Sequence, residues 1–416
     1  MSVQDRPRWR AMPCRWRLTV GLLVLLASAG AGLPGHGGPV RAVAVAAGHV
    51  VSGGFDGAAI LWPEGLVLRG HNGAVAAVAV AEDGTVVTGG ADGKILIWRD
   101  GRQVAALAGH EGPVAGLALR DGMIASASWD GTARLWAADG SSRVLAGHEG
   151  PVNAVAFTPE GLPVTAGYDG TIRVWRKDGG ASVSRLGAPV NAVAVAGDGE
   201  IVAGGADGVL RLWFGDAPPR SLVVDSTPLT SLALSGDGRR IAVVSLGGSA
   251  VVVDRAGLSV TTVLLGVEHP LWAVAFDGNA VVTGGASGVV RRWEAASGRP
   301  TGSYGASVAP EALPAGDRGA QVFRACAACH SLSADGGGRA GPSLHLLFGR
   351  RVASLPGYAY SQALQGMDLV WSEQAVSDLF DRGPQAVTPG TKMPEQRIVD
   401  PADREALVRF LERATR

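Results

Sequence analysis

Residues 147–175 read GHEGPVNAVAFTPEGLPVTAGYDGTIRVW, and the pattern in this stretch returns along much of the chain. It opens with a Gly-His pair, continues through an apolar segment at residues 152–157, and places Asp169-Gly170 six residues before Trp175. Asp-Gly between apolar stretches is a strong hairpin signal, because both residues of the favoured two-residue turn need positive φ. The stretch therefore predicts short antiparallel strands joined by tight turns.

These marks recur at nearly constant spacing, which identifies an internal repeat. Successive repeat tryptophans are 36, 38, 39, 38 and 80 residues apart, and 80 is twice 40, so one Trp is absent at Val253. The repeat tryptophans are Trp62, Trp98, Trp136, Trp175, Trp213 and Trp293. In the first four repeats a Gly-His pair precedes the Trp by 26 or 27 residues, at His36, His71, His110 and His148. Seven repeats therefore cover roughly residues 33–305.

This repeat resembles that of the WD-repeat proteins, whose fold is an all-β seven-bladed propeller. The resemblance implies that the Gly-His histidine, the turn Asp and the repeat Trp form a buried polar network within a blade. Repeats five to seven lack the Gly-His pair, which predicts weaker blades late in the ring. Residues 299–304 follow the last repeat Trp, and we expect them to form the outer strand of the seventh blade. Each blade is then built from contiguous sequence.

The first 29 residues are typical of a signal peptide. Five arginines precede an apolar run of twelve residues from Leu18 to Ala29, which ends in the small residues Ala27-Ser28-Ala29. Twelve helical residues span about 18 Å, well short of the ~30 Å hydrocarbon core, so an uncleaved anchor is the less favoured alternative. We expect cleavage after Ala29, export to the periplasm, and no stable membrane span after cleavage.

Composition excludes several classes of protein. The chain has 416 residues, with 37 basic and 37 acidic side chains, and 47% of its residues are apolar. These values exclude a disordered chain and a basic nucleic-acid binder. Outside the Gly-His pairs the repeat region has only two histidines, His49 and His269, and it has no cysteine. We therefore expect the propeller to be a scaffold and docking surface, with a metal site at the two histidines as the less favoured alternative.

The two cysteines that remain after cleavage stand together in Cys326-Ala327-Ala328-Cys329-His330. A structural zinc site needs four ligands, and His345 supplies only one more. A redox dithiol of the thioredoxin type would follow a strand in a βαβ unit, which the sequence does not predict here. Cys-x-x-Cys-His is the attachment signature of c-type haem, in which two thiols bond the vinyl groups and the His binds iron. The pattern favours haem over zinc, a dithiol or chance.

Residues 316–416 resemble the class I c-type cytochromes of the mitochondrial-like branch, and residues 306–315 read as a linker. The matching residues are Gly319, Phe323, Gly341–Leu344, Leu347–Arg350, Pro356–Ser361, Trp371 and Pro389–Pro394. The resemblance implies an all-α domain with one covalently bound haem c. It implies His330 and Met393 as axial ligands of the iron, with Met367 left to the core. Around the haem propionates it places Arg350, Tyr360, Trp371 and Thr391.

The resemblance also implies packing around these residues. Gly319 and Phe323 of the first helix are expected against Leu407 and Phe410 of the last. Gly341 is expected to pass close to His330, with the Pro342 carbonyl orienting its ring. Two departures matter: Phe380 stands where relatives often have a Tyr that donates to the Met sulfur, and the domain has a single Lys. We expect a looser Met393–iron bond and weak electrostatic steering of partners.

Three functions follow as hypotheses. The first is a periplasmic electron-transfer protein with His/Met-ligated haem c, whose propeller docks a redox partner protein. The alternative is an electron-transfer domain or subunit of a periplasmic oxidoreductase whose propeller holds a substrate or second cofactor. A third is a sensor in which Met393 leaves the iron and a gas binds.

Overall fold

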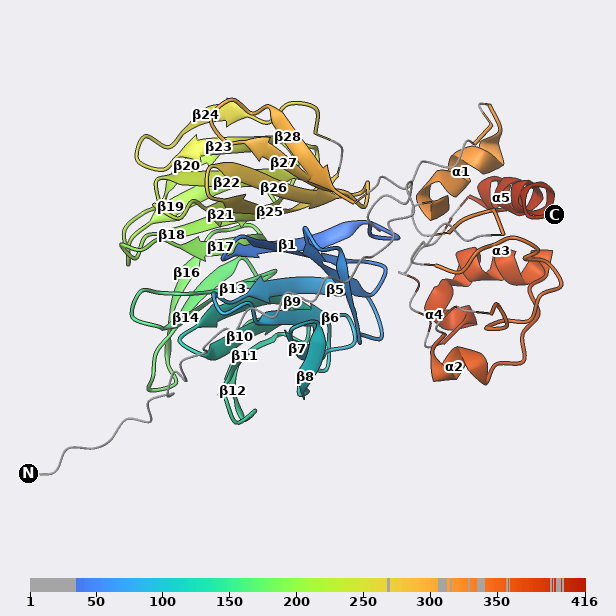
Figure 1. Ribbon diagram of the computed structural model, residues 1–416, viewed down its shortest axis with the longest axis horizontal. Helices are drawn as coiled ribbons and strands as arrows, with labels where there is room; N and C mark the ends of the chain where they lie inside the picture. Colours follow the sequence, from blue (N-terminus) through green and yellow to red (C-terminus); the bar gives the residue numbers. More distant parts are fainter. Residues whose placement is uncertain are drawn as a thin grey trace, which may run out of the picture. The chain divides into compact units, whose positions relative to one another are not determined.

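The computed structural model describes residues 35–416 except 268–269, 306–312, 315, 328–329, 335–340, 357, 359, 390, 392, 394–397 and 399. Its strands run from Val40 to Tyr304 and its helices from Arg318 to Ala414 (Figure 1). The expected signal peptide, residues 1–29, lies outside the described residues, as does most of the expected linker. Among the described residues, no helix has both the length and the apolarity that a membrane span needs.

The described strands form seven four-stranded antiparallel sheets, each made of four consecutive strands. Blade 1 consists of β1 (Val40–Ala46), β2 (His49–Gly54), β3 (Ala58–Trp62) and β4 (Leu66–Arg69). Blade 2 consists of β5 (Val75–Val80), β6 (Val86–Gly90), β7 (Ile95–Arg99) and β8 (Arg102–Leu107). Blades 3 and 4 are β9 (Val114–Arg120), β10 (Met123–Ser128), β11 (Thr132–Trp136), β12 (Ser142–Ala146) and β13 (Val152–Phe157), β14 (Pro163–Gly167), β15 (Thr171–Trp175), β16 (Ala181–Arg185). Blade 5 is β17 (Val190–Val195), β18 (Ile201–Gly205), β19 (Val209–Trp213), β20 (Arg220–Val223). Blades 6 and 7 are β21 (Leu229–Leu234), β22 (Arg240–Ser245), β23 (Ala250–Asp254), β24 (Ser259–Val263) and β25 (Leu271–Asp277), β26 (Ala280–Gly285), β27 (Val290–Glu294), β28 (Pro300–Tyr304).

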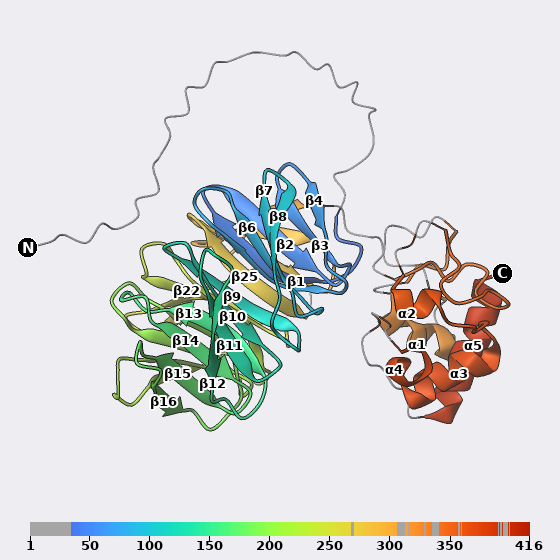
Figure 2. The same cartoon turned by 90° about the horizontal axis from the view of Figure 1, so that it is seen from below.

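The ring closes by packing between the first and last blades. The outer strand of blade 7 is β28, paired with β27, so the expectation that each blade is contiguous is confirmed. The first strand of each blade contacts the first strand of the next, and β1 contacts β25 where the ring meets itself (Figure 2). Val40 and Trp62 of blade 1 are fully buried in one cluster with Val282 and Val290 of blade 7. Closure therefore depends on apolar contact across this seam.

The hairpin turns between the second and third strands differ from the sequence prediction. In blade 4 the Gly170 amide donates to the Gly167 carbonyl at 3.2 Å, and Gly170 has a φ of 73°. The φ of Asp169, by contrast, is not positive. The turn is therefore a wider one that needs glycine only at its last position. Asp169 is held instead by its carboxylate, which accepts from the Thr171 amide at 3.0 Å.

The polar network expected from the resemblance is present in blades 1 to 4, with a fourth member. In blade 1 His36 Nδ1 contacts the Asp56 carboxylate at 3.0 Å, and Nε2 contacts Ser52 Oγ at 2.7 Å. Trp62 Nε1 donates to the same Oγ at 2.8 Å. A carboxylate only accepts, so Nδ1 carries the proton and Nε2 accepts from the hydroxyl. The corresponding hydroxyls are Thr88, Ser126 and Thr165, and each lies ten residues before its Trp.

Blades 5 to 7 use other contacts in place of this network. Asp207 pairs with Arg211 in blade 5, and Ser245 Oγ donates to Asp225 in blade 6 at 2.5 Å. Val253 is fully buried at the position of the absent Trp. Trp293 Nε1 of blade 7 donates to the Leu265 carbonyl at 3.1 Å. The weaker stability of these blades stays a prediction.

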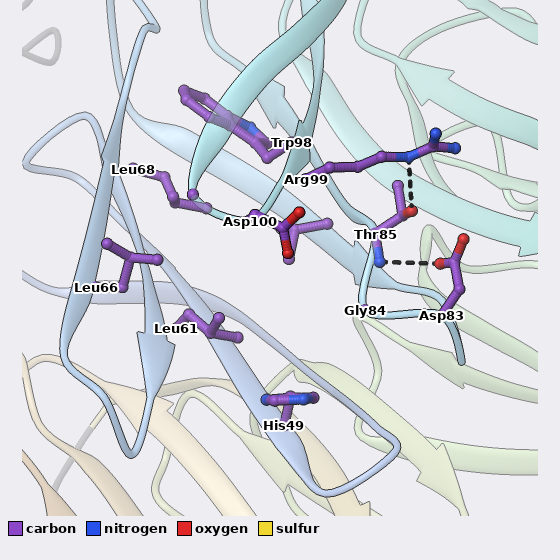
Figure 3. A pocket seen from close by; sticks show the side chains of 12 residues that line it. His49, Leu61, Leu66, Leu68, Asp83, Gly84, Thr85, Trp98, Arg99 and Asp100 are labelled. Atoms are coloured by element: carbon purple, nitrogen blue, oxygen red, sulfur yellow. Dashed lines mark hydrogen bonds between the residues drawn. The ribbon is translucent and has the colours of Figure 1, made fainter. Parts of the chain in front are cut away.

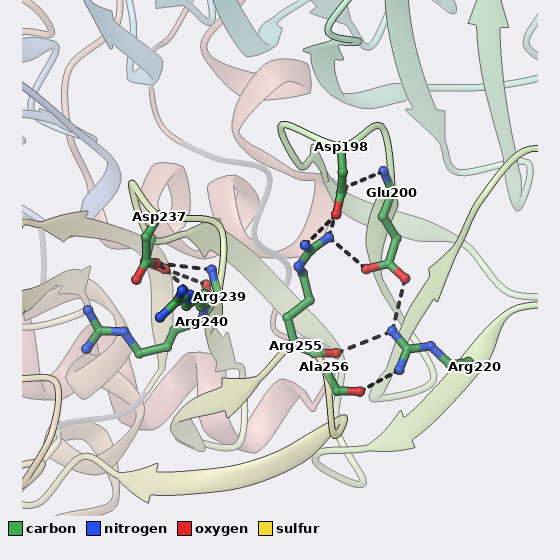
Figure 4. Close-up of polar contacts among 9 residues, drawn as sticks. Asp198, Glu200, Arg220, Asp237, Arg239, Arg240, Arg255 and Ala256 are labelled. Atoms are coloured by element: carbon green, nitrogen blue, oxygen red, sulfur yellow. Dashed lines mark hydrogen bonds and ion pairs between the residues drawn. The ribbon is translucent and has the colours of Figure 1, made fainter.

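An ion network joins blades 5 and 6. The Arg255 guanidinium of blade 6 contacts Asp198 at 2.6 Å and Glu200 at 3.0 Å, both in the turn between β17 and β18 (Figure 4). Arg220 of β20 contacts the other Glu200 oxygen at 3.0 Å. The Arg255 guanidinium lowers the pKa of Asp198 to about 2. Glu200 is almost fully buried, so the network holds a desolvated carboxylate between two arginines.

The helices belong to a separate core. They are α1 (Arg318–Ala327), α2 (Gln362–Gln365), α3 (Glu373–Arg382), α4 (Pro384–Val387) and α5 (Pro401–Ala414). Phe323 of α1 lies 5.5 Å from Phe410 of α5 between ring centroids, and a Cβ on Gly319 would collide with the Ala406 carbonyl of α5. Phe323 and Leu407 are fully buried in the same cluster. The expected packing of α1 on α5 is confirmed, and only glycine allows the two backbones to approach this closely.

Candidate functional site

His330 lies one turn beyond the end of α1, and two neighbours orient its ring. The His330 amide donates to the Cys326 carbonyl at 2.9 Å, which continues the helical spacing past Ala327. His330 Nδ1 lies 2.8 Å from the Pro342 carbonyl. Because a carbonyl only accepts, Nδ1 carries the proton and the lone pair lies on Nε2, the nitrogen that a metal ion would take. The expected role of the Pro342 carbonyl agrees with this contact.

Gly341 lies directly against the same ring. A Cβ on Gly341 would lie 2.6 Å from His330 Nδ1 and 2.8 Å from Nε2, which is closer than real side chains approach. Beyond Gly341 the chain is hydrogen-bonded to the residue that follows His330, because the Leu344 amide donates to the Ser331 carbonyl at 2.8 Å. Pro342 is therefore flanked by Gly341, which packs on the ring, and by this hydrogen bond. The expectation that Gly341 passes close to His330 is confirmed.

Cys326 is buried on α1, in the cluster that contains Phe323 and Leu407. Cys329, the second thiol of the attachment pattern, lies outside the described residues. Met393 is half-buried and packs against the same cluster as Cys326. The buried Phe380 belongs to this cluster too. The structure thus gathers a thiol and a thioether at one core, with the oriented imidazole one turn beyond Cys326.

The structure brings together three of the four residues expected around the propionates, and places the fourth beside Met393. Arg350 and Trp371 pair through their backbones, the Trp371 amide donating to the Arg350 carbonyl at 2.9 Å. Burial raises the pKa of the Tyr360 hydroxyl, and the nearby Arg350 guanidinium opposes this rise. Thr391 Oγ1 accepts from the Met393 amide at 3.2 Å. Binding of propionates by these residues stays a prediction.

Arg350 has a further set of contacts that the sequence did not indicate. Its Nη1 donates to the His345 carbonyl at 2.9 Å and its Nη2 to the Ser343 carbonyl at 2.7 Å. These carbonyls follow Pro342 directly, so the guanidinium fastens the loop that orients His330. No spacing rule marks backbone carbonyls as partners of a side chain, so this contact could not be predicted from the sequence.

The residues present fit a covalently attached haem. His330 offers an imidazole with its proton fixed on the far nitrogen, and Met393 offers a soft thioether, the pair that holds iron in many cytochromes. Cys326 precedes His330 by four residues, as the attachment signature requires. Among the described residues, which leave out Cys329, no three His, Cys, Asp or Glu side chains lie close enough together to hold a metal ion.

The propeller has a cavity of about 390 Å³ between blades 1 and 2. His49 Nδ1 is enclosed there with no hydrogen-bond partner among the described residues. The labelled lining side chains in Figure 3 are His49, Leu61, Leu66, Leu68, Asp83, Thr85, Trp98, Arg99 and Asp100. His269, the other isolated histidine, lies outside the described residues. The lining includes the apolar side chains of Leu61, Leu66 and Leu68 and the carboxylates of Asp83 and Asp100.

Comparison with known proteins agrees with this division of the chain. The family model for cytochrome c matches residues 316–415, and the model for the WD domain, G-beta repeat, matches residues 64–99, 101–137, 140–176 and 181–213. A cytochrome c of Cochliobolus lunatus is 38% identical over 100 residues, which is 24% of this chain and 92% of that protein. A cytochrome c of Arabidopsis thaliana is 38% identical over 100 residues, 24% of this chain and 88% of the relative. A cytochrome c2 of Blastochloris viridis is 39% identical over 101 residues, 23% of this chain and 79% of the relative.

Proposed function

The chain belongs to the cytochrome c family through its C-terminal domain, and on this premise we propose that it is a periplasmic electron carrier whose WD-repeat propeller docks a redox partner. The domain binds haem c covalently and transfers electrons with it. The observation that carries the proposal is the His330 ring, fixed by the Pro342 carbonyl at 2.8 Å and closely covered by Gly341.

Each residue of the site has a distinct part in this proposal. When bound, haem c supplies a one-electron couple at its iron. Cys326 and Cys329 would bond its vinyl groups, so that the group stays attached in the periplasm. His330 Nε2 and the Met393 sulfur would hold the iron. Two protein ligands leave no position for a substrate, and this favours electron transfer over substrate chemistry.

Covalent attachment is tested by making the chain in a host that matures c-type cytochromes. We expect a mass increase of one haem, and an absorption spectrum that changes on reduction. A double variant, Cys326→Ala with Cys329→Ala, is the control and should carry no covalent haem. A colourless product with the mass of the bare polypeptide would contradict the proposal.

Export is supported by the arginine-rich start of the chain, the apolar run from Leu18 to Ala29 and the small residues that end it. We expect the mature protein to begin at Gly30 and to be recovered in the periplasmic fraction. Determining the N-terminal residue of the purified protein tests cleavage. A product that still begins at Met1 and sediments with membranes would contradict export.

Partner docking by the propeller is supported by the charge of the haem domain. Residues 316–416 have twelve basic and eleven acidic side chains and only one Lys, so the domain has little net charge with which to steer a partner. A tethered docking surface raises the effective concentration of the haem at the partner instead. Deleting residues 33–305 should slow reduction by the physiological partner and leave the potential unchanged. An unchanged rate would contradict docking.

One observation favours the oxidoreductase alternative. The cavity between blades 1 and 2 has a volume of about 390 Å³, within the range of small-molecule sites, and His49 Nδ1 has no partner there among the described residues. In this alternative the propeller holds a substrate or second cofactor, and the haem domain removes its electrons. Mass spectrometry and absorption of the purified protein separate the two functions. A second chromophore supports the alternative, and a single haem without one favours the carrier.

A further inference from the structure

Two large aromatic side chains are exposed at equivalent positions of neighbouring blades. Trp129 is 52% exposed and Tyr168 is 61% exposed. Trp129 directly follows β10 and Tyr168 directly follows β14, the second strands of blades 3 and 4. Both therefore lie in turns at the same end of the ring, on blades that contact each other through β9, β10 and β13. Exposed Trp and Tyr are the side chains most enriched in the energetic centres of interfaces.

Each aromatic residue lies in a turn that is tied to a loop carrying an exposed glutamate. In blade 3 the Trp129 amide donates to the Pro113 carbonyl at 3.0 Å, and the Glu111 amide donates to Asp130 at 3.1 Å. The loop that carries Glu111 is thereby tied at two points to the turn that carries Trp129. The Glu111 side chain is exposed.

Blade 4 repeats the arrangement. The Tyr168 amide donates to the Pro151 carbonyl at 2.8 Å, and the Glu149 amide donates to Asp169 at 3.0 Å. The Glu149 side chain is also exposed. The Asp130 and Asp169 carboxylates are engaged by the histidines of their blades, so Glu111 and Glu149 supply the acidic charge that faces solvent.

Of the four blades that carry the polar network, only blades 3 and 4 have both the aromatic residue and the glutamate. The position of Glu111 and Glu149 is taken by Gly37 in blade 1 and Asn72 in blade 2. Blade 2 also has Ala91 in place of the aromatic residue. The loop geometry common to the repeat therefore requires neither the aromatic residue nor the glutamate. The two blades that have both residues are neighbours in the ring.

We propose that Trp129, Tyr168, Glu111 and Glu149, here called the blade 3–4 surface, bind an arginine- or lysine-bearing segment of the redox partner. Aromatic faces attract cations within about 6 Å of the ring centroid, and Trp does so most strongly. An adjacent carboxylate adds a charge-assisted hydrogen bond to the same cation. Complementary charge thus selects a basic segment over an acidic or neutral one. The inference rests on the proposed function, in which the propeller docks a partner.

The test uses the full haem-loaded chain and a fluorescent peptide amide of four arginines, with fluorescence anisotropy at low salt as the readout. A peptide of four citrullines is the matched probe, because citrulline keeps the shape of arginine without its charge. We expect binding of the arginine peptide, with at least about tenfold weaker binding of the citrulline peptide. Trp129→Ala with Tyr168→Ala should weaken arginine-peptide binding about tenfold, and Glu111→Gln with Glu149→Gln should weaken it several-fold and reduce its salt dependence.

Matched control variants lie at the opposite end of the ring. Phe214 is 49% exposed in the turn after β19, and Glu160 is exposed in the turn between β13 and β14. Phe214→Ala with Glu160→Gln should leave binding unchanged. Equal binding of the two peptides, or equal loss in the control variant, would overturn the proposal. The haem spectrum of every variant is recorded beside binding, so that loss of the surface and failure of the carrier function are told apart.

Discussion

His330 is restrained by neighbours that act on different parts of its ring. The Pro342 carbonyl fixes the proton at Nδ1, and Gly341 limits how the ring tilts. Cys326 to His330 could be assigned from spacing alone, because attachment chemistry requires that order of residues. The role of Arg350 in fastening the carbonyls of Ser343 and His345 could not, since any backbone carbonyl fits such a contact.

Gly341→Ala should lower the free energy of unfolding of the haem-loaded domain by about 1–3 kcal/mol, because the new methyl group overpacks the His330 ring. Chemical denaturation followed by haem absorbance measures this change. The unsubstituted haem-loaded protein is the reference. An unchanged free energy of unfolding would mean that the His330 ring is free to move away from the new methyl group.

Met393→Ala should open the iron to carbon monoxide in the reduced protein, because the side chain that we propose as the second protein ligand of the iron is removed. Met367→Ala is the matched substitution and should leave the iron closed, since Met367 is assigned to the core. Absorption spectra with and without the gas provide the measurement. Carbon monoxide binding by the unsubstituted protein would instead favour the sensor hypothesis.

In blades 1 to 4, the polar network separates what could be predicted from what could not. The His, Asp and Trp members recur at fixed offsets, and the resemblance to the WD-repeat proteins predicted that they meet. The hydroxyl residue ten positions before the Trp was missed because it alternates between Ser and Thr. Contacts between blades, such as Arg255 with Asp198, have no repeated spacing and could not be predicted.

Ser126→Ala removes the hydroxyl that joins His110 Nε2 and Trp136 Nε1. Two buried polar atoms lose their partner, so we expect the free energy of unfolding of the propeller to fall by about 1–3 kcal/mol. Thermal or urea unfolding measures the change. Ser221→Ala, at an exposed position of β20, should have almost no effect. If the Ser126→Ala variant unfolded with the same free energy as the unsubstituted protein, the network would contribute little to the stability of the propeller.

Burial lowers the pKa of His110 and His148, so both are neutral in the folded blades. An unfolded His titrates near pH 6.5, and below that value the unfolded chain takes up more protons than the folded one. Blades 3 and 4 should therefore be most stable above about pH 6.5 and lose stability as the pH falls toward the lowered folded values. Hydrogen exchange of these blades across this range, with His110→Gln and His148→Gln as the comparison, measures the loss. A loss of the same size in the variant would assign it to other groups.

Asp169 belongs to the same network and acts at lower pH. Burial alone would raise the pKa of Asp169, but hydrogen bonds from the Glu149 amide, His148 and Thr171 lower it to about 2. Its contribution is present above the ordinary range of an Asp and is lost as the pH falls toward about 2. The histidine effect therefore comes first on acidification.

On the scale of the whole molecule, the described apolar clusters divide without overlap. One cluster contains only residues of the helical domain, and the others contain only residues of the seven blades. Each domain therefore has its own core and meets the usual condition for folding alone.

The variant with Cys326→Ala and Cys329→Ala should keep the unfolding transition of the propeller while losing or weakening that of the helical domain, because only the latter surrounds the attached group. Scanning calorimetry with circular dichroism distinguishes the two transitions. The unsubstituted haem-loaded chain is the reference. Loss of both transitions together would show that the propeller depends on the haem domain.

The seam between blades 1 and 7 has a further consequence. In the described residues each blade keeps its own four strands, and a Cβ on Gly305, just after β28, would lie 2.9 Å from Gly35, just before β1. The two ends of the ring thus already meet, and blades 7 and 1 contact each other through their first strands, as the other neighbouring blades do. A circularly permuted gene that joins these ends and reopens the ring between two other blades would encode the same toroid, with the electron-carrying module moved to a different point on its circumference.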